Sequence, residues 1–115
     1  MKLKVLWQDE YKNEIDHALM ARMSGNEGMA RVCARRAAGI VIGEYLYRLG
    51  YSDLTHSAYE RLSMFTDLPD VDQQFKDIAN HLLLKVNLDH KFPLDADLIS
   101  EVMFLKKSLL GEADH

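Results

Sequence analysis

The chain has few of the residues that mark disulfide-bonded or irregular proteins. It contains one cysteine, Cys33, and two prolines in 115 residues. A single thiol cannot form an intramolecular disulfide, which excludes a secreted disulfide scaffold. The apolar run at the N-terminus, residues 3–7 apart from Lys4, is too short for a signal peptide, and no stretch approaches the 18 or so apolar residues of a membrane span. We therefore expect a cytoplasmic protein without a membrane partner.

Recognisable cofactor and metal motifs are missing as well. The sequence has no phosphate-binding loop, no dinucleotide fingerprint, no His-Glu-x-x-His and no cysteine pairs at zinc spacing, so we expect no cofactor and no metal. The formal net charge is −4, and the overall field of such a protein does not attract nucleic acid. Binding of a nucleic acid would need a local basic patch.

What the sequence does have is helical periodicity along almost its whole length. Apolar residues make up 48% and charged residues 28%, as in ordinary globular proteins. Alternation with a period of two is confined to residues 2–6, which leaves no room for a sheet. We predict one all-α domain over residues 1–115, an up-and-down bundle of about five helices, with a short arm at 1–8 and a frayed polar tail at 112–115.

The first two helices are the most clearly marked. We place one over residues 9–23, with Gly25 or Asn26 as its stop, and a second over 27–49, ending at Gly50. The second is apolar around most of its circumference, so we expect it at the centre of the bundle. Its interior Gly39 and Gly43 each cost about 1 kcal/mol of helix propensity relative to alanine. A neighbouring helix that approaches this face closely would explain them.

The remaining helices are bounded by capping residues. We expect the third to begin near Ser52 or Asp53, the fourth to be capped by Asp70, and the fifth by Asp95. The side chains predicted to point inward from the first and third helices are Tyr11, Ile15, Ala18, Leu19, Leu54, Ala58, Leu62 and Phe65. Those from the fourth and fifth are Val71, Phe75, Ile78, Ala79, Leu82, Leu83, Val86, Leu98, Ile99, Val102, Met103, Leu105 and Leu109.

A polar row on the second helix is the first candidate binding site. Glu27, Arg31 and Arg35 follow one another at i,i+4 spacing, and Arg36 is adjacent. Such a row forms an exposed ion-pair ladder worth about 0.3–0.5 kcal/mol per pair, binds an anion or phosphate, or makes salt bridges between subunits. Arg31, Arg35 and Arg36 are our candidate binding residues.

Other reactive side chains are interpreted as structural. Cys33 is predicted to be a small buried residue, although neighbouring cations such as Arg36 could lower a thiol pKa. His17 and His56 are predicted at the surface or its boundary, and His81 at an edge of the core. The segment from Lys85 to His90 places a cation and a histidine beside a polar turn before the last helix, a pairing that can support acid–base chemistry.

Nearly the whole chain, from Glu10 to Leu110, resembles the HEPN-domain family of small helical bundles. The resemblance is carried by the Gly25–Gly28 turn, the run from Ala30 to Gly39, and the connection from Asp89 to Asp95 before the final helix. Many members of that family are metal-independent ribonucleases whose Arg-x4–6-His motif is assembled across a homodimer, often as toxins paired with a nucleotidyltransferase.

The resemblance implies a homodimer, a possible nucleotidyltransferase-type partner, and RNA or a nucleotide as ligand. Here Lys85 stands where the family has arginine, five residues before His90. Lysine keeps the charge but lacks the planar guanidinium fork. We therefore expect a non-catalytic HEPN-like module that dimerises and binds a partner protein or nucleotide. The alternative is a metal-independent RNA-cleaving protein that uses His90 for proton transfer and Lys85 to contact the phosphate.

Overall fold

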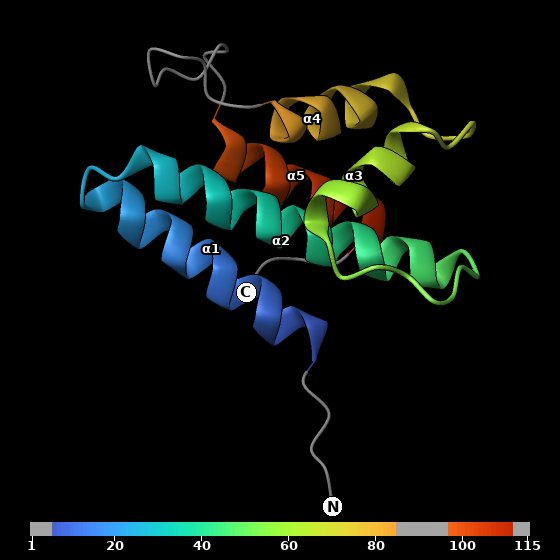
Figure 1. The fold of residues 1–115 in the computed structure, drawn as a ribbon, viewed down its shortest axis with the longest axis horizontal. Helices are drawn as coiled ribbons and strands as arrows, with labels where there is room; N and C mark the ends of the chain where they lie inside the picture. Colours follow the sequence, from blue (N-terminus) through green and yellow to red (C-terminus); the bar gives the residue numbers. More distant parts are fainter. Residues whose placement is uncertain (1–5, 85–96, 112–115) are drawn as a thin grey trace, which may run out of the picture.

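A computed structural model describes residues 6–84 and 97–111, and these form an all-α bundle (Figure 1). The described helices are α1 (Trp7–Met23), α2 (Glu27–Arg48), α3 (Ala58–Thr66), α4 (Gln73–Leu83) and α5 (Leu98–Leu110). The predicted fold class, a small helical bundle without a sheet, is confirmed for the described part of the chain. None of these helices is both long and apolar enough to cross a membrane.

Helix α2 lies at the centre of the bundle, as predicted. It packs against each of the other four helices, and it runs antiparallel to α1, which lies alongside it (Figure 1). The Asn26 side chain caps its start by accepting a hydrogen bond from the Met29 backbone amide at 3.0 Å. The residues that α2 buries are Ala30, Cys33, Ala34, Ala37, Ala38, Gly39, Val41, Ile42, Gly43 and Leu46. Most are small, so several neighbouring helices can approach its axis.

The predicted close approach at the two interior glycines is confirmed. A Cβ atom added at Gly39 would lie 2.6 Å from the Cβ and 2.9 Å from the Cα of Ala58, at the start of α3. A Cβ at Gly43 would collide with the guanidinium of Arg61, also on α3. Contact between non-bonded carbon atoms is favourable only near 3.5–4.0 Å. At Gly39 only glycine therefore allows α3 to sit this close to α2, whereas the flexible end of Arg61 could move away from a Cβ at Gly43.

Three predicted helix starts differ from the structure. Helix α3 begins at Ala58 rather than near Ser52, because the Ser57 side chain accepts the Glu60 amide and caps the helix there. Helix α4 begins after Asp72 rather than Asp70, and α1 begins at Trp7, two residues before the predicted start.

The cap of α5 differs as well. Asp97 is its N-cap and accepts the Ser100 amide at 3.2 Å, whereas Asp95 lies outside the described residues. Several aspartates and serines in each connection could cap a helix. Composition alone did not identify which of them does so.

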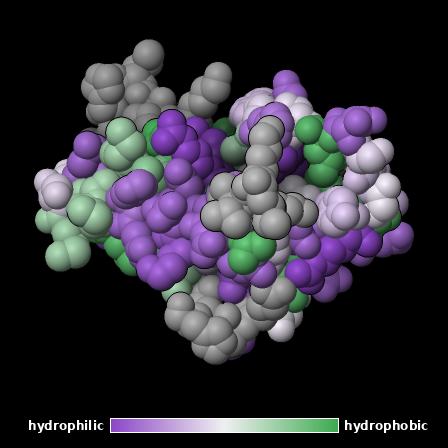
Figure 2. All heavy atoms as spheres, turned by 90° about the horizontal axis from the view of Figure 1, so that it is seen from below, coloured by the Kyte–Doolittle hydropathy of each residue, from purple (hydrophilic) through white to green (hydrophobic). Residues whose placement is uncertain are grey.

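Most side chains predicted to point inward are buried or half-buried, with two clear exceptions. Leu19 on α1 is 41% exposed and Met103 on α5 is 37% exposed. The face that α5 turns inward includes Val102, Leu105 and Lys106, and this leaves Met103 at its edge. Val86 lies outside the described residues. Leu19 belongs to a group of exposed apolar side chains near the α1–α2 turn, which we call the methionine end: Leu19, Met20, Met23 and Met29. Figure 2 shows pale green apolar side chains gathered at this end of the molecule.

Candidate functional site

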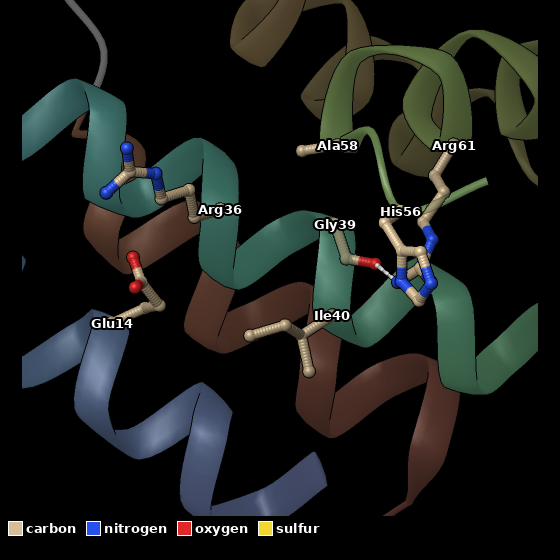
Figure 3. Close-up of a pocket in the computed structure, with 7 residues that line it drawn as sticks. All are labelled: Glu14, Arg36, Gly39, Ile40, His56, Ala58 and Arg61. Atoms are coloured by element: carbon tan, nitrogen blue, oxygen red, sulfur yellow. Dashed lines mark hydrogen bonds between the residues drawn. The ribbon is translucent and has the colours of Figure 1, made fainter.

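A cleft of about 420 Å³ lies where α1, α2 and the start of α3 meet (Figure 3). Its volume falls within the range of small-molecule sites. It is lined by Glu14 from α1, by Arg36, Gly39 and Ile40 from α2, by His56 from the loop before α3, and by Ala58 and Arg61 from α3. Glu14 and Arg36 lie at one end of the cleft, and His56 and Arg61 lie at the other, with Gly39 between them (Figure 3).

The close packing of α3 on α2 builds the floor of this cleft. Because Gly39 and Ala58 carry little or no side chain, the two backbones meet there, and longer side chains project on either side. Arg61 extends from α3 across the surface of Gly43. The small residues thus fix how far His56 and Arg61 lie from the α1 side of the cleft.

Arg61 holds the α3 end of the cleft together. Its Nε donates to the Thr55 carbonyl oxygen at 2.6 Å, and its Nη1 donates to the Gly39 carbonyl oxygen at 3.0 Å. Burial lowers the pKa of its guanidinium from the usual value, and the negative charge of Glu10 works in the opposite direction. Arginine remains charged under all ordinary conditions. Arg61 therefore gives this end of the cleft a fixed positive charge.

The other three charged or titratable side chains of the cleft have unused hydrogen-bonding capacity. Arg36 is exposed and makes no hydrogen bond or ion pair with any residue that the structure describes. The same holds for His56 within the described ranges. The Oε2 atom of Glu14 is buried and has no hydrogen-bond partner there. Buried polar atoms are seldom left without a partner in folded proteins, so this cleft is a candidate site for a ligand.

Of the three predicted binding residues, only Arg36 lines the cleft. Arg35 turns to the other side of α2, where its Nε donates to the Leu82 carbonyl oxygen at 2.6 Å and its Nη2 to the Leu84 carbonyl oxygen at 3.1 Å. Burial, and then the charge of Arg31, lower the pKa of Arg35. Arg31 is half-buried on α2 and does not line the cleft. The structure therefore separates Arg36 from the other two.

The exposed ion pair predicted for Glu27 involves a different helix. Glu27 accepts a hydrogen bond from Arg22 Nε at 3.1 Å, and Arg22 Nη1 also pairs with Asp97 at 3.0 Å. Arg22 thereby joins the end of α1, the start of α2 and the start of α5. Lys85 and His90, the pair implied by the family resemblance, lie outside the described residues.

Cys33, His17 and His56 lie where the sequence predicted them. Cys33 is buried, and burial together with the nearby charge of Glu14 raises the pKa of its thiol, against the opposing effect of Arg36. His17 and His56 are exposed. The described residues include no group of three or more His, Cys, Asp or Glu side chains that could hold a metal ion.

His81 lies between two helices at the edge of the core. Its Nδ1 lies 2.9 Å from Oε2 of Glu101 on α5. This contact ties α4 to α5 and confirms the position predicted for His81.

Glu14 and Arg61 were not singled out in the sequence, although their spacing contained a signal. Glu14 lies three residues after Tyr11 and four before Ala18, and both of these are buried on α1. A carboxylate within an apolar stripe is unusual because burying its charge is costly. Arg61 similarly follows Ala58 by three residues on α3.

No protein-family model matches this chain, and searches of curated proteins and of solved structures find no significant match.

Proposed function

We propose that this protein is a non-catalytic helical binding module that takes a small anionic ligand, of the nucleotide class, in the cleft between α1, α2 and α3. The observation that carries the proposal is that Arg36 and His56 line one cleft with unused donors, beside the fixed charge of Arg61. By contrast, Arg22, Arg35 and Arg61 are engaged in hydrogen bonds within the protein.

A phosphate group fits this set of side chains. Guanidinium groups bind phosphate through two parallel N–H donors, and a histidine can add a further hydrogen bond. The protein as a whole is negatively charged, so long-range attraction does not bring the anion to the cleft. Affinity must then come from short-range contacts, and it should depend on Arg36 individually.

Calorimetric titration with AMP, GMP, CMP and UMP at low ionic strength tests the proposal. We expect Arg36→Gln to weaken binding about ten-fold or more, since a hydrogen bond to a charged group contributes about 1.5–3 kcal/mol. Lys107→Gln is the matched control, because Lys107 is an exposed cation on α5 that does not line the cleft. The proposal is wrong if no nucleotide binds at millimolar concentration, or if the two variants bind equally well.

We also propose that the module forms a homodimer through exposed apolar side chains. Tyr47 is 69% exposed near the end of α2, and Tyr51 lines a smaller hollow of about 280 Å³ with Leu49 and Pro69. Tyr45 is half-buried, lines the same hollow and packs edge-to-face on Phe65. Contiguous exposed apolar surface often marks an interaction site. Sedimentation at tens of micromolar should give the mass of a dimer, and a monomer would contradict this proposal.

RNA cleavage through His90 and Lys85 is the alternative function, and it rests on the sequence. We expect no cleavage of a mixed-sequence RNA by the wild-type protein, with or without a chelator. If cleavage occurs and is lost in His90→Ala, the alternative replaces the non-catalytic assignment. Lys85→Arg should then cleave at least as fast as the wild type, because arginine binds phosphate in a bidentate manner.

A further inference from the structure

Glu14 is a carboxylate that the proposed anion site does not explain. A negative charge at one end of a cleft that binds an anion opposes that binding through space. The buried Oε2 atom of Glu14 accepts no hydrogen bond from the residues that the structure describes. An unpaired buried acceptor has lost its water without compensation. Glu14 is thus a carboxylate at the wall of the cleft whose acceptors no described residue uses, and a ligand in the cleft could supply a donor to it.

The geometry points to Glu14 as the residue that accepts a hydrogen bond from the ligand, which therefore carries a hydroxyl or amino donor beside its anionic group. This inference rests on the proposed function and names which anions the cleft prefers. Glu14 lines the cleft and only its Oε2 atom is buried without a partner, so Oε1 is the oxygen that a ligand in the cleft would contact. Arg36 lies beside Glu14 at one end of the cleft, and Arg61 at the other end gives the anionic group a positive charge apart from Glu14 (Figure 3).

A comparison of inorganic phosphate with a nucleoside monophosphate separates two effects of Glu14: its repulsion of the anionic group and the hydrogen bond that it accepts. Inorganic phosphate supplies the anion without the organic donor groups, whereas a nucleoside monophosphate adds ribose hydroxyls and, in AMP, a base amino group. In the wild-type protein AMP should bind more tightly than inorganic phosphate. We expect Glu14→Gln to strengthen the binding of inorganic phosphate about threefold, because a repulsive charge is removed. The same variant should weaken the binding of AMP about ten-fold, because the charged acceptor is lost.

If Glu14 had a purely structural role, its replacement would change the affinities for both ligands in the same direction. Opposite changes in the two affinities are therefore the diagnostic result. Glu10→Gln is the matched control: Glu10 lies one turn earlier on α1, is exposed and does not line the cleft. It should change the two affinities in parallel. Binding of 2′,3′-dideoxy-AMP and of IMP to the wild-type protein identifies the donor, because the first lacks the ribose hydroxyls and the second lacks the base amino group.

The outcomes of this experiment are distinguishable from those of the Arg36 test. If Arg36→Gln weakens both ligands but Glu14→Gln strengthens both, the anion site stands and the role of Glu14 as an acceptor is overturned. Equal affinity of the wild-type protein for phosphate, AMP and both analogues would also overturn it. If neither phosphate nor AMP binds the wild-type protein, the anion site and this inference are both overturned.

Discussion

Three arginines link α2 to its neighbouring helices, and they do so in two different ways. In the middle, Arg35 reaches from α2 to carbonyl oxygens at the end of α4, and Arg61 reaches from α3 to the Gly39 carbonyl oxygen of α2. At the N-terminal end, Arg22 pairs with the carboxylates of Glu27 and Asp97. All three arginines are half-buried, but the carboxylate partners of Arg22, Glu27 and Asp97, are 51% and 52% exposed.

The difference shows how the exposure of its partner sets the contribution of an arginine to stability. A backbone carbonyl at a half-buried position needs a donor, and losing that donor leaves an acceptor without water or a partner. An exposed arginine–carboxylate pair gains little, because water and salt compete for both partners. We therefore expect the junctions in the middle of α2 to determine stability, and the Arg22 contacts to contribute much less.

The largest effect should come from filling the contact between Gly39 and Ala58. We expect Gly39→Ala to destabilise the protein by about 1–3 kcal/mol through overpacking, even though alanine gains about 1 kcal/mol of helix propensity. The nearest atoms are the Cβ and Cα of Ala58, which cannot move without shifting α3. Urea denaturation monitored by circular dichroism measures the change.

Gly28→Ala is the control for this substitution. Gly28 is in the first turn of the same helix, and an added Cβ would meet nothing closer than 3.7 Å. It should be neutral or stabilising. A Gly39→Ala variant as stable as Gly28→Ala would mean that the backbones of α2 and α3 do not approach as closely as described.

The second loss of stability should come from replacing Arg35. We expect Arg35→Met to lower the free energy of unfolding by about 1–3 kcal/mol, because it leaves the part-buried carbonyl oxygen of Leu82 without its donor, whereas water can reach the exposed carbonyl oxygen of Leu84. Arg35→Lys should restore only part of this loss, since an ammonium group cannot bridge two carbonyls with a planar fork. The measurement is again urea denaturation at neutral pH.

The position of Arg35 gives this prediction a functional control. Arg35 does not line the cleft, so folded Arg35→Met should bind AMP as the wild type does. If Arg35→Met instead loses AMP binding while its stability is unchanged, Arg35 is a ligand contact and the comparison between the two regions fails.

The fold was predictable because it depends on patterns that are local in sequence. The central position of α2 followed from its apolar circumference, and the close contact at Gly39 followed from two glycines four residues apart in a helix. The helix starts were less predictable. Ser57, Asp72 and Asp97 were each one of several possible caps, and the choice depends on how the connection packs against the bundle.

The candidate site was predictable only in part. Arg31, Arg35 and Arg36 are close in sequence, but adjacent positions on a helix differ by about 100° in direction, so Arg35 and Arg36 point to different neighbours. Arg36 meets Glu14, His56 and Arg61 only after α1 and α3 pack on α2. The spacing within one segment can mark an unusual residue such as Glu14, but it does not show which residues of other helices that residue meets.

The smallest effect at neutral pH should come from the Arg22 contacts, and acid should reveal it. Burial of Asp97 favours its protonated form, but hydrogen bonds from Arg22 and Ser100 outweigh this and hold the pKa of Asp97 below its usual value. A carboxylate whose pKa is lowered by folding stabilises the protein above its unfolded pKa of about 3.9 and loses that contribution as the pH falls through the folded value. Wild-type stability should therefore fall more steeply below about pH 4 than that of Asp97→Asn.

Arg22→Met should lower the free energy of unfolding by less than about 1 kcal/mol per pair at pH 7, and it should flatten the acid transition in the same way. The double variant should add little to either single variant, because both remove the same interaction. Additive effects on the acid transition would mean that the lowered pKa of Asp97 does not depend on Arg22. Other contacts would then hold the exposed end of α2.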